Sequence, residues 1–389
     1  IMLVSFPIAK RGAAMGVFGL VMITAPAIGP TLSGWIIEHN SWRALFEMIL
    51  PLAILTIILA VFKMKNVTEN KRATLDVLSV ILSTIGFGGI LYGFTSAGNK
   101  EWSDPWVYGT ILIGVISLTA FIVRQLKIKE PLLEFRAYKY PMFALSSVIS
   151  IVLAMAMFSG MILTPLYTQT VRGISPLDSG LLMLPGALVM GVMSPITGRL
   201  FDKYGARSLA IIGLIIMTVA TYLLTDLSTE TSYTYLMVVY SIRMLGISMV
   251  MMPISTNGLN QLPANYYPSG TAINNTLQQV SGAIGTAILL TFMNHRTESV
   301  AEDLAAEAMK KAAEAGQTVQ PSAEAMAAMQ TEIGVQALLE GINYTFFISM
   351  IIGIVALVLA FFVKRATPPL VENKASTTIS KENKPSISH

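Results

Sequence analysis

Apolar windows of about 20 residues recur along the whole chain, and they limit its fold more than any other feature. A helix needs roughly 20 apolar residues to cross a bilayer core of about 30 Å. Ten windows have this length, at residues 13–37, 43–62, 77–97, 106–123, 143–169, 180–198, 208–225, 234–258, 270–293 and 344–363. Only 12% of the residues are charged, about half the share in a typical soluble domain. The sequence therefore predicts an all-α fold, a polytopic membrane helix bundle.

The Lys and Arg residues are unevenly distributed between the two sides of these windows. If the residues before the first window are cytoplasmic, 19 of the 26 basic residues lie on the cytoplasmic side, six lie on the other side, and Arg243 lies inside a window. Basic loops of membrane proteins face the cytoplasm. We therefore expect a multi-pass protein of the cell (plasma) membrane, with both ends of this chain in the cytoplasm. The net charge of +4 then reflects topology, and we expect no nucleic-acid partner.

Residues that carry catalytic or metal chemistry are few and scattered. The chain has no Cys and three His, namely His39, His295 and His389, all outside the uninterrupted apolar segments. This composition excludes disulfides, thiolate ligands and a cysteine nucleophile, and we expect no metal site. The sequence also lacks the nucleotide-binding pattern G-x-x-x-x-G-K-[ST]. It therefore predicts neither an enzyme nor a cofactor.

The segment APAIGPTLSG interrupts the first apolar window with two prolines and two glycines. Pro and Gly disfavour a helix interior most, by about 3 and about 1 kcal/mol. From Gly12 onward the small residues and prolines recur largely at steps of three or four, so one helix face is almost bare and suits close contact with another helix. We predict a bent, tightly packed seam at Pro26, Gly29, Pro30 and Gly34. A packing kink without a role in transport is the alternative.

A similar spacing of small residues returns in PSGTAINNTLQQVSGAIGTAI, residues 268–288. Repeated halves are typical of transporters. The segment GRLFDKYGAR, Gly198–Arg207, precedes the second copy, whereas only eleven residues precede Gly12 in the first. If the halves match, we expect an N-terminal portion of about four spans, about 100–120 residues, upstream of Ile1, and fourteen spans in all.

Two motifs resemble those of a known family. GRLFDKYGAR resembles the cytoplasmic-loop motif G-x-L-a-D-r-x-G-r-k of the major facilitator superfamily, with Gly198, Leu200, Asp202, Lys203, Gly205 and Arg207 in register. PAIGPTLSGW resembles the antiporter motif of its fifth span, with Pro26, Gly29, Pro30 and Gly34 matching. Asp76 stands where the fourteen-span members usually have D-W-x-G. The chain is therefore similar to the fourteen-span drug:proton antiporter family, the EmrB/QacA-like multidrug exporters, and among these to lincomycin-resistance-type proteins.

The resemblance implies a division of the chain into four parts. Residues 1–64 would be the remainder of an N-terminal six-helix half, 65–140 two linker helices inserted between the halves, and 141–365 the C-terminal six-helix half. This last half has an external loop at 295–341, where we expect two short amphipathic helices lying against the bundle or the membrane surface. Residues 366–389 are polar, which predicts a disordered cytoplasmic tail.

The resemblance further implies a proton-coupled multidrug efflux transporter that exports hydrophobic or amphipathic compounds by alternating access. The proton gradient would supply the energy, and the partners would be small-molecule drugs, protons and the lipid bilayer. The 23 Met residues, with Phe158, Tyr167 and Phe292, suit a pocket for varied apolar ligands, although lipid-facing or core positions are the simpler alternative. A dedicated exporter of one metabolite, peptide or antibiotic is a close alternative. A non-transport receptor or membrane enzyme is a remote one.

The resemblance gives the cytoplasmic-loop motif a role as a latch between two helices in one state of the transport cycle. Gly198 and Gly205 permit close approach of the chain at the turn. The Asp202 carboxylate can cap a helix or pair with neighbouring basic residues, which include Lys203 and Arg207. A basic turn that merely follows the positive-inside rule is the alternative.

Four charged residues are candidates for proton coupling or for binding a substrate charge: Arg243, Glu47, Asp76 and Asp178. A cation near mid-span costs about 2.5–3.5 kcal/mol on insertion scales, so Arg243 needs a partner or a water-filled cavity. With Gly246, it resembles the superfamily's fourth-span motif, whose arginine is implicated in proton coupling; structural pairing is the alternative. The acids lie near span ends, where an interfacial position is the alternative, and for Asp178 in ISPLDSG a helix cap.

Overall fold

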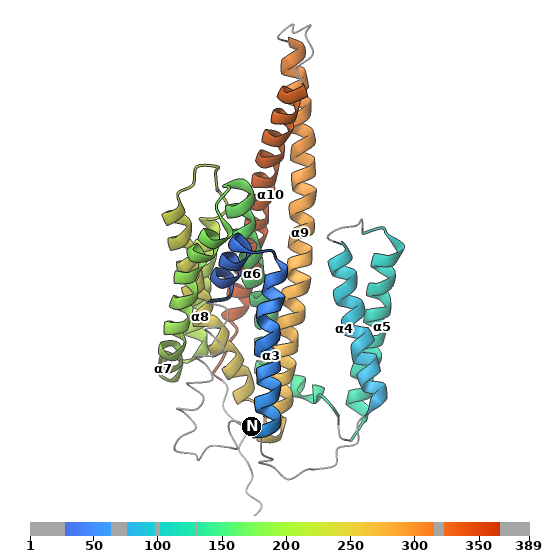
Figure 1. The fold of residues 1–389 in the computed structure, drawn as a ribbon. Helices are drawn as coiled ribbons and strands as arrows, with labels where there is room; N and C mark the ends of the chain where they lie inside the picture. The colour runs from blue at the N-terminus through green and yellow to red at the C-terminus, as the bar shows by residue number, and fades with distance from the viewer. Residues whose placement is uncertain (1–27, 64–75, 98–101, 130, 315–322, 366–389) are drawn as a thin grey trace, which may run out of the picture.

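The described part of the chain is a bundle of long helices (Figure 1). The computed structural model describes residues 28–63, 76–97, 102–129, 131–314 and 323–365. Within these ranges there is no strand, and eight helices are long and apolar enough to cross a membrane. The all-α membrane fold that the sequence predicts is confirmed.

The described helices have the following order along the chain. The first described helix covers residues 28–39. The long helices are α3 (Arg43–Lys63), α4 (Val77–Ala97), α5 (Pro105–Lys127), α6 (Pro141–Leu166), α7 (Pro176–Tyr222), α8 (Tyr233–Asn260), α9 (Tyr267–Glu314) and α10 (Ala323–Ala360). Three short turns complete the described elements: η2 (Phe135–Lys139), the π-helical η3 (Tyr167–Val171) and η4 (Ala264–Tyr266).

Nine of the ten apolar windows lie on these eight helices to within about three residues at their C-terminal ends, because α7 accounts for two of them. The two arms of α7 meet at Gly205, whose φ of 77° is in the left-handed region that glycine adopts without a steric penalty. Most of the remaining window, 13–37, lies outside the described residues. Pro26 and the tail 366–389 also lie outside them.

Several helices begin at the residues that local sequence signals indicate. The Asp104 carboxylate accepts a hydrogen bond from the Trp106 backbone N–H at 2.8 Å, and Pro105 is the first residue of α5. Ser232 caps α8 in the same way, through the backbone N–H of Tyr235. Such caps satisfy backbone donors that a helix start leaves without a partner.

The core of the bundle lies between α6, α7, α8 and α10. Buried apolar side chains from these helices, including Ile149, Leu214, Ile247 and Phe346, form one continuous cluster. At the crossing of α7 and α8, a Cβ on Gly246 would lie 2.6 Å from the Gly213 carbonyl oxygen. Glycine therefore allows the two backbones to approach closely, as in other membrane helix pairs.

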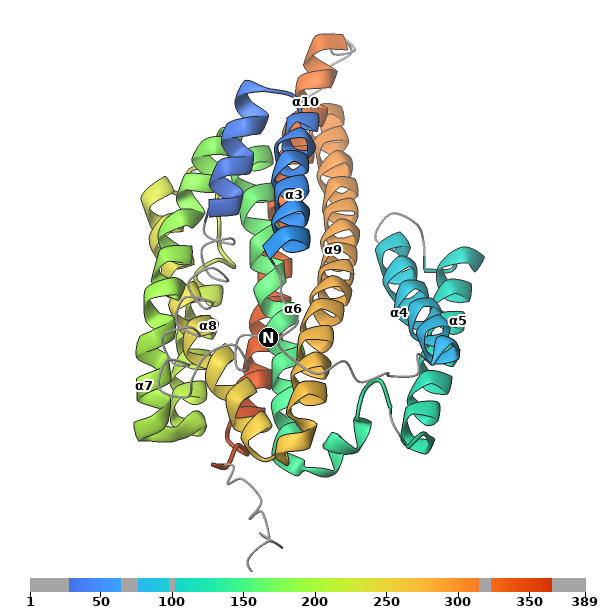
Figure 2. The same ribbon diagram turned by 60° about the horizontal axis from the view of Figure 1, so that its bottom comes forward.

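Helices α4 and α5 form an antiparallel hairpin at one side of the bundle (Figures 1 and 2). Glycines again lie at the crossing, where a Cβ on Gly89 would lie 2.8 Å from the Thr110 carbonyl oxygen and one on Gly114 would lie 2.6 Å from the Ile90 nitrogen. The hairpin also contacts α9. The domain boundaries predicted for this region, 65–140, remain a prediction.

Helices α9 and α10 extend beyond the other helices as a pair (Figure 1). The expected external helices at 295–341 exist, but as continuous extensions of these two helices and not as short separate ones against the bundle. This expectation is therefore corrected. Residues 295–314 contain no Gly or Pro and are rich in Ala and Glu, which favour helix, so nothing in the sequence ends α9 at the membrane.

Candidate functional site

A cavity of about 580 Å³ lies between α6, α7, α8 and α9. Pro30 of the helix at 28–39 also lines it, so one residue of the predicted seam reaches this space. Ligand pockets for drug-sized molecules have volumes of about 300–1,000 Å³. The cavity is therefore large enough for a small organic molecule.

Three helices supply the mostly apolar part of the cavity wall. From α7 and α8 the lining residues are Met183, Ala187, Met190, Tyr240, Met244 and Met251. From α6 they are Ser150, Leu153, Ala154, Met157, Phe158 and Met161. Methionine side chains are flexible and polarisable, so they adapt to ligands of different shape.

Six of the 23 Met residues line this cavity together with Phe158, in line with the pocket interpretation, whereas lipid-facing or core positions remain the simpler interpretation for most of the others. The other two aromatic residues expected there lie elsewhere. Tyr167 is buried and its hydroxyl donates to the Ser228 carbonyl. Phe292 is 43% exposed and does not line the cavity.

The α9 wall of the cavity is polar. Asn275, Gln278 and Gln279 line it, at positions i, i+3 and i+4 of one helix, a spacing that places side chains on one face. The motifs in the sequence do not identify these three amides as candidate site residues. The signal was available in NNTLQQ, where amides at helical spacing interrupt an otherwise apolar span. None of the described lining residues is ionised.

Arg243 lies behind the cavity wall and is fully buried. Its Nε donates to the Thr221 hydroxyl at 3.1 Å, and its Nη2 donates to the Ala156 carbonyl. Its Nη1 has no hydrogen-bond partner among the described residues. The sequence predicts that this cation has a partner. Within the described structure its hydrogen-bond acceptors are a hydroxyl and a carbonyl, and not an acid.

Gly160 of α6 makes room for this guanidinium. A Cβ at Gly160 would overlap Arg243 Nη1. The neighbours of Arg243 on α8, Tyr240 and Met244, line the cavity. A buried charge therefore lies one layer behind a wall whose described residues carry no charge.

The predicted seam contacts the start of α7. A Cβ on Gly34 would overlap the Pro176 carbonyl, and one on Gly180 would lie 2.7 Å from the Pro30 carbonyl oxygen. The Thr31 hydroxyl donates to the Gly180 carbonyl at 3.1 Å. No described atom lies within 4 Å of a Cβ built on Gly29. Two segments about 150 residues apart thus lie in backbone contact at Gly34 and Gly180, but not at Gly29.

The cytoplasmic-loop motif covers the bend in α7. Gly205 adopts the positive φ of the bend, and Gly198 leaves room for Met252, whose Cε would lie 3.7 Å from an added Cβ. The Asp202 backbone carbonyl accepts a hydrogen bond from Arg365 Nη2 at 3.3 Å. The side chains of Asp202, Lys203 and Arg207 are exposed, and Lys203 Nζ lies 5.1 Å from the centre of the Tyr204 ring. The latch role of this motif remains a prediction.

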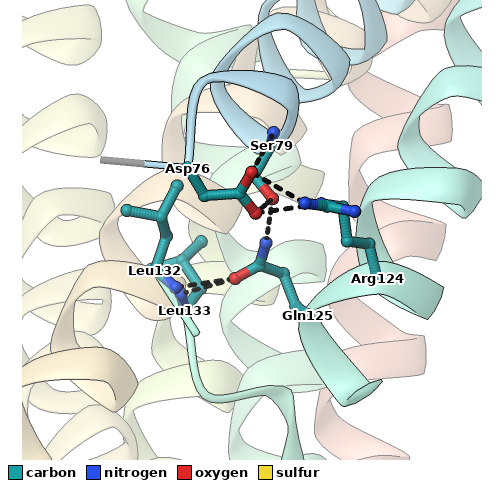
Figure 3. Close-up of polar contacts among 6 residues, drawn as sticks. All are labelled: Asp76, Ser79, Arg124, Gln125, Leu132 and Leu133. Carbon is teal, nitrogen blue, oxygen red and sulfur yellow. Dashed lines mark hydrogen bonds and ion pairs between the residues drawn. The ribbon is translucent and has the colours of Figure 1, made fainter. Parts of the chain in front are cut away.

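Asp76 lies at the start of α4 in a polar network with the end of α5 (Figure 3). Arg124 donates to both carboxylate oxygens of Asp76, through Nε and Nη2, at 2.9 Å each. The Ser79 hydroxyl also donates to this carboxylate. Hydrogen bonds from Arg124 and Ser79 stabilise the ionised form and lower the pKa of Asp76 to about 2.

Gln125 extends this network to the segment after α5 (Figure 3). Its Nε2 donates to the Ser79 hydroxyl at 2.7 Å, and its Oε1 accepts from the backbone N–H groups of Leu132 and Leu133. The side chain is almost fully buried. The network therefore joins α4, α5 and the chain that leads into α6.

The two remaining acidic candidates lie away from the cavity. Glu47 is on the exposed surface of α3, a helix without a buried side chain in the described structure. Asp178 lies in the first turn of α7, where its backbone N–H donates to the hydroxyl of the capping residue Ser175 at 3.1 Å. Its backbone carbonyl accepts from the Tyr233 hydroxyl at 2.9 Å. The helix cap expected in ISPLDSG is therefore present.

The eight described helices that are long and apolar enough to cross a membrane indicate a multi-pass membrane protein, and four of them surround the cavity. A family model of the Major Facilitator Superfamily matches residues 1–286. The chain belongs to the Major Facilitator Superfamily, a family of transporters.

Several curated relatives agree with this assignment. The MFS-type transporter YcnB of Bacillus subtilis is 44% identical over 375 residues, which cover 96% of this chain and 73% of YcnB. The lincomycin resistance protein LmrB of the same organism is 44% identical over 368 residues, covering 93% of this chain and 72% of LmrB. The MFS-type transporter YhcA of Bacillus subtilis is 51% identical over 295 residues, and the chain spans 56% of its length.

A solved structure has the same fold. The bacterial homolog of the human lysosomal transporter Spinster, in an inward-facing and occupied conformation, matches with a TM-score of 0.52 and 15% identity. The match covers 94% of this chain and 72% of that one.

Proposed function

We propose that this protein is a proton-coupled multidrug exporter of the cell membrane that moves hydrophobic and amphipathic compounds by alternating access. The observation that carries this proposal is the Met-rich cavity of about 580 Å³, because adaptable apolar walls accept varied ligands. The relatives named lincomycin resistance protein support drug export as the direction of transport. The excess of Lys and Arg in one set of loops supports cytoplasmic ends.

The seam between the helix at 28–39 and α7 gives the proposed export cycle a structural element. Its contacts at Gly34 and Gly180 are backbone to backbone, and Pro30 belongs both to the seam and to the cavity wall. A change in this contact therefore acts directly on the cavity. We propose that the seam closes one end of the cavity in one state of the cycle.

Arg243 is our candidate among the described residues for the coupling step. Among the described residues this buried cation has no acidic partner and its Nη1 has no hydrogen-bond acceptor, an arrangement that is costly in a membrane bundle and that a functional role explains better than packing does. The guanidinium itself stays protonated. Its proposed role is therefore to influence a proton carrier or a bound substrate through its charge.

The test measures drug accumulation in a bacterium that lacks its own efflux pumps. Expression of the full-length protein should lower the accumulation of drugs in a broad panel of uncharged compounds and cations, the latter including ethidium, and a protonophore should abolish the difference. A panel without any protonophore-sensitive difference would contradict the proposal. Cells with an empty vector and a Gly34→Leu variant, which disrupts the seam, are the controls.

A dedicated exporter of one antibiotic or metabolite is the second candidate. It is supported by a more distant relative, the tetracenomycin C resistance and export protein of Streptomyces glaucescens, which is 23% identical over 381 residues. The same drug panel separates the two candidates. A dedicated exporter lowers the accumulation of one compound class, whereas a multidrug exporter lowers several.

A further inference from the structure

The cavity has two chemically different sides. The α7 and α8 wall consists of methionines, Ala187 and Tyr240, whereas the α9 wall presents Asn275, Gln278 and Gln279. The three amides share one face of α9 because they lie at positions i, i+3 and i+4. A molecule in the cavity therefore meets apolar surface on one side and amide groups on the other.

The three amides have hydrogen-bonding capacity that no described residue uses. None of them makes a hydrogen bond to a described residue, although each amide has two N–H donors and a carbonyl acceptor. Their neighbour Asn274 differs, because it is buried, accepts from the Ser147 hydroxyl at 3.3 Å and donates to the Ser255 hydroxyl at 3.4 Å. Asn274 joins α9 to α6 and α8 through these hydrogen bonds, whereas the three lining amides are available to bind a ligand.

Electrostatics favours an uncharged ligand. No described lining residue is ionised, so a charged ligand would lose hydration without gaining an ion pair from this wall. The buried charge behind the wall is Arg243, a cation with no described acidic partner. It disfavours a positively charged molecule in the neighbouring cavity.

We propose that Asn275, Gln278 and Gln279 determine substrate specificity, and that the cavity selects uncharged amphipathic molecules carrying amide, carbonyl or hydroxyl groups. The polar groups of the ligand bind the α9 amides, and its apolar part packs against the methionines of α7 and α8. This inference rests on the proposed transport function, since it concerns the same cavity. A site that hydrogen-bonds its substrate discriminates against an analogue lacking the bonding group.

The test replaces both glutamines by methionine, which has a similar volume but cannot donate a hydrogen bond. The probes are chloramphenicol, which is uncharged and carries an amide and hydroxyls, and ethidium, which is a cation. Binding to the purified full-length protein is measured by titration, and export by accumulation in pump-deficient cells. The matched control is Gln336→Met on the exposed extension of α10, outside the cavity.

We expect the Gln278→Met, Gln279→Met double variant to bind chloramphenicol about tenfold more weakly, since each lost hydrogen bond is worth up to about tenfold in affinity. Its ethidium binding and the control's chloramphenicol binding should be unchanged. A second variant, Gln278→Glu, should weaken chloramphenicol binding and strengthen ethidium binding, because it places a negative charge in the cavity. This gain of binding cannot come from a misfolded protein.

Three outcomes overturn the inference: no chloramphenicol binding by the unaltered protein, unchanged binding by the double variant, or equal losses for both probes with no gain in Gln278→Glu. The proposed transport function fails separately. If the drug panel shows efflux but the amide variants bind chloramphenicol normally, only the specificity inference is wrong. If chloramphenicol binding depends on the amides but no compound is exported, the transport proposal is wrong and the site remains.

Discussion

The bundle of α6, α7 and α8 and the hairpin of α4 and α5 use the same packing device in different surroundings. In both, glycines allow two helices to touch, at Gly213 and Gly246 in the bundle and at Gly89 and Gly114 in the hairpin. The crossing of α7 and α8 in the bundle is surrounded by buried apolar side chains, and the same two helices line the cavity. The hairpin has mostly exposed apolar surface and a polar network at one end.

This difference indicates where a change should spread. Tyr240 and Met244 of α8 line the cavity, and Gly246 of the same helix forms the crossing with α7. A displacement of α8 therefore moves the cavity wall. Changes in the hairpin network act on residues that do not line the cavity, so their effect on transport should be small.

The largest effect is expected from Gly246→Leu. The added Cβ would lie 2.6 Å from both the Gly213 carbonyl oxygen and the Met217 nitrogen, and backbone atoms on the facing helix cannot rotate away. We expect destabilisation at or above the upper end of the about 1–3 kcal/mol typical of overpacking. The yield of folded, monodisperse protein in detergent should collapse. The control is Gly88→Leu in the hairpin, where no described atom lies within 4 Å of the new Cβ. A normal yield of Gly246→Leu would show that the crossing of α7 and α8 is not tightly packed.

The next effect concerns the seam. In Gly34→Leu the side chain overlaps the Pro176 carbonyl, whereas Gly29→Leu meets no described atom within 4 Å. The helix at 28–39 is mostly exposed, so it can shift away from α7 as a unit, which the buried crossing at Gly246 cannot do. We therefore expect Gly34→Leu to reach the membrane in normal amounts but to lose export by at least about tenfold, as expected for a transition-state or closure defect of about 1.4 kcal/mol. Gly29→Leu should export normally. Drug accumulation and membrane yield, measured on both variants, test this; equal behaviour of the two would remove the seam from the transport cycle.

Arg243→Met separates a charge effect from a packing effect inside the bundle. Replacing a buried charge by an apolar side chain of similar volume is often neutral or stabilising. The Thr221 hydroxyl still donates to the Met217 carbonyl at 2.8 Å, so it is not left without a partner. We therefore expect an unchanged or higher Tm, with loss of proton-driven export and preserved drug binding.

Gly160 provides an internal check on that variant. Gly160→Ala overlaps Arg243 Nη1 and should lower the Tm, whereas the same change in the Arg243→Met background should have little effect. Such non-additivity is expected only for residues in contact. If Arg243→Met itself fails to fold, the arginine is a structural residue and its proposed coupling role is wrong.

Hydropathy predicts the spans of this protein closely because the bilayer imposes a simple length requirement. The window 77–97 coincides with α4, and 43–62 differs from α3 by one residue. Hydropathy does not predict where a helix ends when the helix continues beyond the apolar segment that crosses the bilayer. Residues 295–314 continue α9 as one helix, because helix propensity and not hydropathy determines its length outside the bilayer.

The candidate site could be predicted only in part, because spacing along a helix shows which residues share a face but not what that face meets. The antiporter motif predicts Pro30 as a site residue, and Pro30 lines the cavity. The amides Gln278 and Gln279 share a helix face in the sequence pattern, but this pattern does not show that the face lines the cavity. The pairing of Asp76 with Arg124 joins residues 48 positions apart, and only the tertiary fold brings them together.

The smallest effect is expected at the hairpin, from Asp76→Asn. The pair with Arg124 is partly exposed, with 21% of the Asp76 side chain and 37% of the Arg124 side chain accessible, and such pairs contribute little to stability. We expect a fall in Tm of at most a few degrees and nearly normal export. Asp303→Asn, on the exposed extension of α9, is the matched control.

The pH dependence of this variant distinguishes a structural acid from a proton carrier. The pKa of Asp76 is lowered from 3.8 to about 2, so the ionised form is favoured in the folded protein. Its stabilising contribution is complete above about pH 4 and is lost as the pH falls through about 2. The difference in Tm between Asp76→Asn and the unaltered protein should therefore be the same at pH 5 and pH 8. Two results would instead identify Asp76 as the proton carrier: a difference in Tm that changes between pH 5 and pH 8, or an Asp76→Asn variant that has a normal Tm but no longer couples export to protons. Either result would extend the functional site from the bundle to the hairpin.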